Sequence, residues 1–233
     1  MLKSFAALAA LLVLCGGAHA TTLFPRDRTC PVGGETFKSF AIGSTSSFGA
    51  RLDLRPMGPQ AHLPTVECPN GFVVFKAEED FTPAEIATLT PVVASATYQA
   101  ARQTEPIAGR TVLLMQALGT DEAGLRNVLL LAAFEAEDAG AEDLRQKYLT
   151  RAAAAYDAFV AAHPAQDEDW WVAKLRAAEI ARQQSRFDDA IRIADGLASL
   201  KPPGDGWFGD VAKQIKAKAV LKDAAPAPFE SPN

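Results

Sequence analysis

The sequence predicts a mostly α-helical protein with a small β-rich module near its N-terminal end. Two observations predict this fold class. From Thr82 onward the chain carries helix start and stop signals at short intervals, whereas residues 29–80 carry short runs of β-branched and aromatic residues between glycines and prolines. Of the 233 residues, 48% are hydrophobic and 22% are charged. A disordered chain is poorer in apolar residues, so we expect a folded chain of one domain or two small ones.

Residues 1–20 have the pattern of an export signal. Lys3 precedes an apolar run from Phe5 to Leu14, and small residues follow, with Ala18 and Ala20 in the positions that a signal peptidase recognises. The apolar run is shorter than the roughly 20 residues that cross a bilayer, and no later run reaches that length. We therefore expect an exported protein, periplasmic or secreted, with cleavage after Ala20 and no stable membrane span.

Two other interpretations of this segment stay open. One is a buried N-terminal helix. The other is a lipoprotein acylated at Cys15, although Leu14 stands where such sites usually have a small residue.

The charge of the chain argues against nucleic acid as a partner. The formal net charge is −5, and loss of the segment with Lys3 makes it more negative. Modest acidity favours solubility and opposes polyanionic partners.

Cleavage would leave two cysteines, Cys30 and Cys68. An even pair in an exported chain predicts a disulfide, because that compartment is oxidising. The alternative is a metal site of Cys30, Cys68 and His62. It offers three ligands, and structural zinc needs four, so we expect no metal and no cofactor.

Short strands and loops surround the cysteines. Thr36–Ile42 and Phe72–Lys76 carry the aromatic and β-branched residues of strands. Gly43–Gly49 and Arg55–Pro64 are rich in glycine, serine or proline and are predicted to be loops.

The helical part begins at a capping box. Thr82 is an N-cap, proline follows at the first helical position, and Glu85 lies three residues after the cap. This helix is expected to run to about Leu89, where Pro91 interrupts it, and a second stretch to run to about Arg102. Further helices are predicted from about Pro106 to Gly119 and over Asp121–Ala139, Ala141–Ala162, Asp169–Gln184, Phe187–Leu200 and Asp205–Lys222.

The helices form pairs with short turns, which suggests tandem helical hairpins. The segment from Trp171 to Pro202 resembles a tetratricopeptide repeat, with Ala178 and Ala190 at the positions where two helices cross closely. Lys174 and Ala181 depart from that pattern, which usually has a tryptophan and another aromatic residue there. The resemblance implies a concave groove for a peptide or partner helix. Its expected lining residues are Val172, Leu175, Glu179, Arg182 and Gln183.

The two cysteines lie in related contexts. Cys30-Pro31-Val32-Gly33-Gly34 and Cys68-Pro69-Asn70-Gly71 resemble a pair of C-P-x-C-G zinc knuckles, each without its second cysteine. Over most of residues 29–200 the chain resembles an uncharacterised bacterial family that has two such knuckles followed by tetratricopeptide-like helices. This resemblance implies a degenerate zinc-ribbon-like cap in which the two remaining sulfurs lie close enough to form a disulfide in place of zinc. It implies no defined activity.

The predicted organisation has four parts: a signal peptide at 1–20, a degenerate zinc-ribbon-like β module at 21–80, a helical repeat-like domain at 81–222 and a disordered tail at 223–233. We expect an exported interaction or scaffold module of the bacterial envelope that binds a protein or peptide. His62 and His163 lie in no recognised catalytic signature, and no catalytic residues are predicted. The alternatives are an envelope enzyme acting on the cell wall, or a metal carrier using Cys30, Cys68 and His62.

Overall fold

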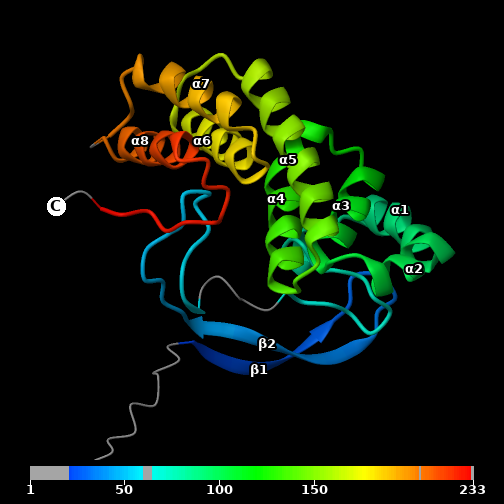
Figure 1. Ribbon diagram of the computed structural model, residues 1–233. Coiled ribbons are helices and arrows are strands. Elements are labelled where there is room, and N and C mark those ends of the chain that lie inside the picture. Colours follow the sequence, from blue (N-terminus) through cyan, green and yellow to red (C-terminus); the bar gives the residue numbers. More distant parts are fainter. Residues whose placement is uncertain (1–20, 60–64, 205, 232–233) are drawn as a thin grey trace, which may run out of the picture.

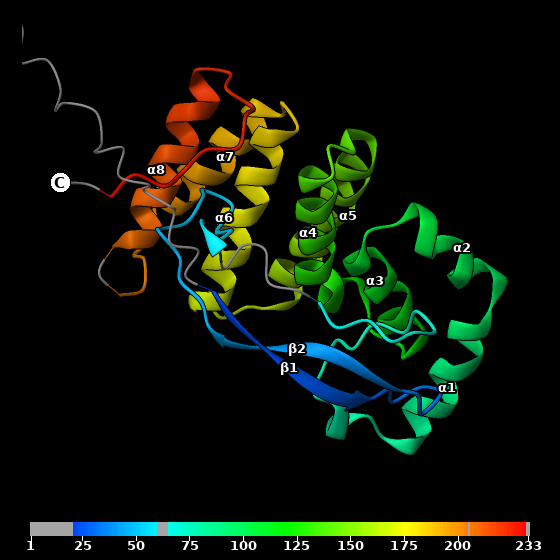
Figure 2. The same ribbon diagram turned by 90° about the horizontal axis from the view of Figure 1, so that it is seen from below.

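The computed structural model describes residues 21–59, 65–204 and 206–231 (Figure 1). Eight helices form a row, and a long twisted β-ribbon lies along one side of it (Figures 1 and 2). The predicted signal peptide and His62 lie outside the described residues. Within them, no helix is both long and apolar enough to cross a membrane.

The ribbon consists of two antiparallel strands, β1 (Thr22–Thr29) and β2 (Thr36–Ser44). The strand expected over Thr36–Ile42 is therefore present and slightly longer, whereas β1 was not expected. The strand expected over Phe72–Lys76 is wrong, because this segment contributes only an isolated bridge between Glu67 and Val73.

The disulfide expected from the sequence is present and follows directly on the ribbon. Cys30 and Cys68 are bonded, with their Cα atoms 5.8 Å apart. Each cysteine begins a tight turn, in which its carbonyl accepts a hydrogen bond from the amide of Gly34 or Gly71 respectively. Asn70 joins the two turns by donating to the carbonyl oxygen of Val32 at 2.6 Å.

Eight helices follow a short 3-10 turn, η2 (Glu78–Asp80). They are α1 (Pro83–Ala94), α2 (Ala96–Thr104), α3 (Ile107–Ala117), α4 (Glu122–Asp138), α5 (Glu142–Ala162), α6 (Glu168–Gln183), α7 (Phe187–Ala198) and α8 (Trp207–Val220). The capping box is confirmed, since Thr82 and Glu85 exchange hydrogen bonds at the start of α1. The predicted stop near Leu89 is wrong. Helix α1 continues through Pro91, and Leu89 and Val93 on either side of the proline are buried.

Three large clusters of buried residues make up most of the core. One joins the disulfide and Phe72 to α1–α3 through Tyr98 and Leu114. A second lies between α3 and α6. The third lies between α6 and α8 and includes Leu52 and Ala227, which belong to neither helix. The small β-rich module therefore shares its apolar core with the first helices.

The tail differs from the expected disorder. Residues 223–231 run back along the molecule, and their backbone pairs with the segment that follows the ribbon (Figure 1). The amide of Leu52 donates to the carbonyl of Ala227, and the amide of Phe229 donates to the carbonyl of Ala50, both at 2.9 Å. The three prolines of the tail do not prevent this, because the pairing uses amides and carbonyls of other residues.

Candidate functional site

The predicted partner groove on α6 is filled by the chain itself. Leu175, Glu179, Arg182 and Gln183 are buried, and Val172 is partly buried against the same apolar cluster. The tail and the segment around residues 50–55 cover them. The expectation of an open groove lined by these five residues is therefore wrong for this structure.

Arg182 holds the tail in place. Its side chain is fully buried and bonds to both carboxylate oxygens of Glu179, with the Nε–Oε2 distance at 2.7 Å. The guanidinium also donates to the backbone oxygens of Asp223 and Ala225. Burial raises the pKa of Glu179, against the effect of the neighbouring Arg182. The backbone of the tail thus lies on Arg182, where a partner was expected to bind.

A second set of polar contacts holds the segment that follows the ribbon. Gln183 donates to the carboxylate of Asp53 at 3.0 Å and accepts from Arg145 at 2.5 Å. Arg51 forms ion pairs with Asp53 and with Glu137 of α4. Because these side chains bond to one another, they form a structural network that fixes the segment on α4, α5 and α6.

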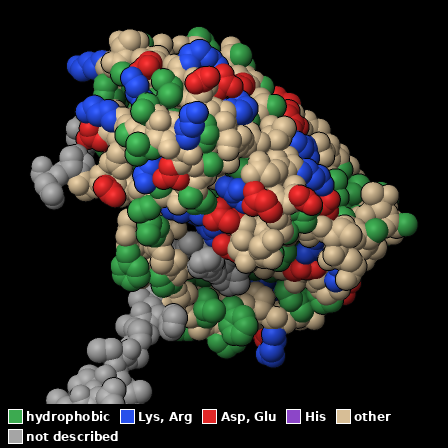
Figure 3. All heavy atoms as spheres, in the orientation of Figure 1, with side chains coloured by type: hydrophobic (Ala, Val, Ile, Leu, Met, Phe, Trp, Pro, Cys, Tyr) green, Lys and Arg blue, Asp and Glu red, His purple; other side chains and the backbone are tan. Residues whose placement is uncertain are grey.

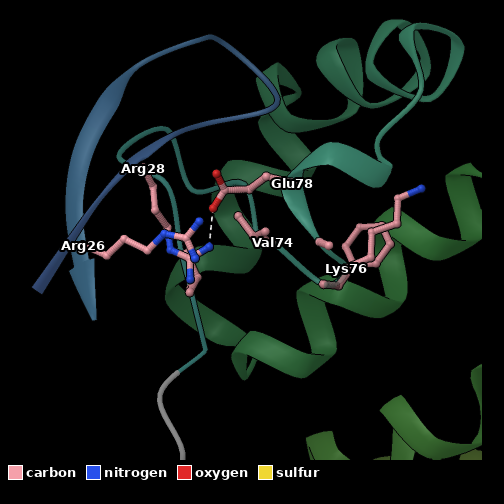
Figure 4. A pocket seen from close by; sticks show the side chains of 8 residues that line it. Arg26, Arg28, Val74, Lys76 and Glu78 are labelled. Carbon is pink, nitrogen blue, oxygen red and sulfur yellow. Dashed lines mark hydrogen bonds and ion pairs between the residues drawn. The ribbon is translucent and has the colours of Figure 1, made fainter. Parts of the chain in front are cut away.

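An open pocket lies between the ribbon and the segment around Val74. Its volume is about 460 Å³, and it is lined by Arg26, Arg28, Val66, Val74, Phe75, Lys76, Ala77 and Glu78. Figure 4 shows Arg26 and Arg28 reaching from β1 toward Glu78, whereas the ammonium of Lys76 points away from them. The alternation of side chains along a strand explains why residues 26 and 28 share this inner face.

Among the described side chains that line the pocket, the positive charges outnumber those paired with a carboxylate by one. Arg28 forms an ion pair with Glu78 and donates to Ser39 at 3.0 Å. Lys76 pairs with Glu85 at 2.7 Å, and this contact, together with hydrogen bonds from the backbone and side chain of Thr82, lowers the pKa of Glu85 to about 2. Among the side chains that the structure describes, which do not include that of Glu79, no carboxylate pairs with Arg26, which is exposed.

The outer face of the ribbon is apolar at one end. Leu23, Phe40 and Ile42 are 40%, 56% and 43% exposed, and Figure 3 shows apolar side chains gathered on this side of the molecule. The nearby Phe24 and Phe48 are also exposed, at 54% and 70%. These five make up most of the large apolar side chains that are exposed in the described part of the chain.

Position 33 shows how far this module departs from a zinc knuckle. Gly33 stands where the second cysteine of the first knuckle would be, and its φ of +100° is one that glycine adopts readily and other residues rarely. A Cβ atom there would lie 2.4 Å from Glu35 Oε2 and 2.8 Å from Asn70 Nδ2. A cysteine therefore does not fit at this position without rearrangement of its neighbours.

Among the described candidate residues, His163 belongs to a surface contact at the start of α6. His163 pairs with Asp167 at 2.9 Å on the surface, and Asp167 also caps α6 by accepting from the amide of Trp170. No group of three or more potential metal ligands occurs in residues 21–59, 65–204 and 206–231. The disulfide also removes both thiols on which the metal-carrier alternative depends.

Sequence reasoning missed the pocket because β1 was not recognised. Pro25 and the charged residues of β1 obscure the usual strand pattern, although Arg26 and Arg28 alternate with Pro25 and Asp27 as inner and outer positions of a strand. Comparison of the chain with protein-family models, with curated proteins and with solved structures gives no match.

Proposed function

We propose that this protein is an exported interaction module that binds a carboxylate-bearing peptide segment of a partner in the pocket under the ribbon. The observation that carries the proposal is the guanidinium of Arg26, which has no carboxylate partner among the described side chains, in a pocket where Arg28 and Glu78 already neutralise each other. A carboxylate of the partner supplies the missing anion.

Arginine suits this task. Its planar guanidinium presents parallel N–H donors that match the two oxygens of a carboxylate. The apolar walls of the pocket, Val66, Val74 and Phe75, offer surface for the carbon atoms of the bound segment. The pocket is open, so an extended peptide can enter from the solvent.

The ribbon is fixed in position before a partner arrives. The Cys30–Cys68 disulfide anchors the end of the ribbon that follows Thr29. Phe37 packs against the core that this disulfide shares with α1–α3. The Arg28–Glu78 ion pair joins the ribbon to η2. Such preorganisation reduces the entropy lost on binding.

Two features of the chain support a location outside the cytoplasm. The sequence pattern of residues 1–20 and a disulfide in the folded chain both favour an oxidising compartment outside the cytoplasm. We propose the bacterial envelope as this location, and tetratricopeptide-like helices as the scaffold that carries the module.

The test measures binding of a fluorescein-labelled glutamate hexapeptide by fluorescence anisotropy, with a glutamine hexapeptide as the neutral probe. The protein binds the glutamate peptide more tightly, and Arg26→Gln weakens this binding by about tenfold, the loss of one charge-assisted hydrogen bond. Arg192→Gln is the matched control, because Arg192 is 71% exposed on α7, outside the residues that line the pocket. Equal affinity for the two peptides, or no effect of Arg26→Gln, refutes the proposal.

A further inference from the structure

The outer face of the ribbon points away from the pocket that contains Arg26 and has its own pattern of apolar and charged side chains. In an antiparallel pair, residues directly opposite each other lie on the same face. The outer face therefore carries the cross-strand pairs Leu23–Ile42, Pro25–Phe40, Asp27–Lys38 and Thr29–Thr36. Its first two pairs are apolar, and its third is an exposed ion pair of 3.1 Å.

This face has no covering element among the described residues. The sheet contains only β1 and β2, and a two-stranded ribbon is only marginally stable without further packing. The inner side of the ribbon packs through Phe37, whereas Phe40 and Ile42 on the outer side are 56% and 43% exposed. Exposed apolar residues on one face of a sheet are usually covered when that face packs against a second sheet.

We propose that the outer face of the ribbon binds the same face of a second copy of this chain, related by a two-fold axis that runs parallel to the strands. This rotation places β1 of one copy over β2 of the other. Each outer residue then lies over the copy of its own cross-strand partner.

The arrangement makes every layer of the interface complementary. Leu23 lies over Ile42 of the second copy, and Pro25 lies over Phe40 of the second copy. Asp27 lies over Lys38 of the second copy, and the symmetry repeats the same attraction on the other side. Such charge complementarity fixes register and orientation in an interface.

The other two-fold orientation matches the face less completely. An axis across the strands reverses one ribbon relative to the other and places β1 over β1. If that axis passes through Pro25, Asp27 lies over Leu23 of the second copy, and if it passes through Asp27, the two copies of Asp27 face each other. If it passes between the layers of Leu23 and Pro25, the apolar layers meet, but Asp27 and Lys38 face no opposite charge of the second copy. Only the axis parallel to the strands therefore matches the apolar layers and the charged layer at once.

The small size of the ribbon sets the expected strength of the dimer. A strand of eight residues is about 26 Å long, and the face of two strands is smaller than the roughly 800 Å² per partner of a standard interface. We therefore expect a reversible dimer whose population depends on protein concentration. The pocket with Arg26 stays open in it, because Arg26 lies on the inner face.

The experiment is sedimentation velocity of the purified protein across a concentration series, with two charge-reversal variants. The wild type shifts from one chain to two as its concentration rises. Asp27→Lys gives two lysines per outer face and Lys38→Asp gives two aspartates, so each variant alone dimerises at least about tenfold more weakly. An equimolar mixture of the two restores dimers of mixed composition, because each lysine then lies over an aspartate.

Two further variants keep the result interpretable. The double variant Asp27→Lys with Lys38→Asp restores both the pair within each chain and the pairs between chains, and it dimerises like the wild type. Phe40→Ser removes apolar surface without changing the charge and abolishes the dimer, while its circular dichroism stays that of the wild type. A wild type that stays monomeric, variants that dimerise as well as the wild type, or a mixture that forms no mixed dimer overturns the proposal. Each of these outcomes is independent of peptide binding by Arg26.

Discussion

The substitution Arg182→Met tests whether the residues expected to form a partner groove are instead an internal anchor. Methionine fills much of the arginine side-chain volume but leaves the carboxylate of Glu179 buried without its cation. Both side chains have zero exposure. Removing one partner of a buried ion pair typically costs about 3–5 kcal/mol of unfolding free energy. The carbonyls of Asp223 and Ala225 also lose a donor, at about 1 kcal/mol each where water does not replace it.

The double variant Glu179→Leu with Arg182→Met separates the two contributions. It removes the buried charge together with its partner, so we expect it to cost less than Arg182→Met alone. The single loss must also depend on pH. In Arg182→Met the buried carboxyl has a pKa above its unfolded value of about 4.3, so the folded variant holds the proton more tightly than the unfolded chain. The free energy of unfolding of Arg182→Met therefore falls as the pH rises above 5 and recovers as the pH is lowered toward 5.

Urea unfolding followed by circular dichroism at pH 5 and pH 8 measures these quantities. Arg192→Met serves as the control, since surface substitutions usually stay within about 0.5 kcal/mol. A cost of Arg182→Met below about 1 kcal/mol, or a double variant at least as unstable as Arg182→Met alone, refutes the anchor. A deficit that grows from pH 8 to pH 5 also refutes it.

Three further predictions concern the rest of the fold. Reducing the disulfide, or replacing both cysteines with serine, lowers the free energy of unfolding by up to about 4 kcal/mol, because the bond closes a loop with a sequence separation of 38. An unchanged urea midpoint in dithiothreitol contradicts this. The contacts of Glu85 with Lys76 and Thr82 lower its pKa to about 2, so their stabilising effect is present above the unfolded pKa and is lost as the pH falls toward 2. The melting temperatures of the wild type and Glu85→Gln should therefore converge as the pH falls toward 2, and a constant difference argues against this. Gly109→Ala places a Cβ atom too close to the hydroxyl oxygen of Tyr148. It should lower the free energy of unfolding by about 1–3 kcal/mol despite the higher helix propensity of alanine. A variant as stable as the wild type shows that Tyr148 moves freely.

The helices were predictable because their end signals are local. Thr82 and Glu85 form the expected capping box, and Gly119 and Gly140, with φ of +83° and +66°, follow the C-caps of α3 and α4. Pro91 was misleading because packing outweighs its local effect. A proline inside a helix removes one backbone hydrogen bond, but the buried Leu89 and Val93 beside it keep α1 continuous.

The tail and the first strand were not predictable because their order depends on distant residues. The tail is held by Arg182, more than 40 positions earlier in the chain. Strand β1 exists only through its pairing with β2. The candidate site depends on this pairing as well, since Arg26 and Arg28 share a face only once the segment is extended. The disulfide was predictable, because Cys30 and Cys68 are the two cysteines of the sequence after residues 1–20.

The central claim is that Arg26 supplies the unpaired charge that binds a carboxylate. Nuclear magnetic resonance of the arginine Nε–Hε groups tests it most directly during titration with the glutamate hexapeptide. The Arg26 signal should shift saturably, with a smaller shift of its neighbour Arg28 and none of Arg192. An unmoved Arg26 signal at saturation, or shifts confined to arginines far from the ribbon, would contradict the account.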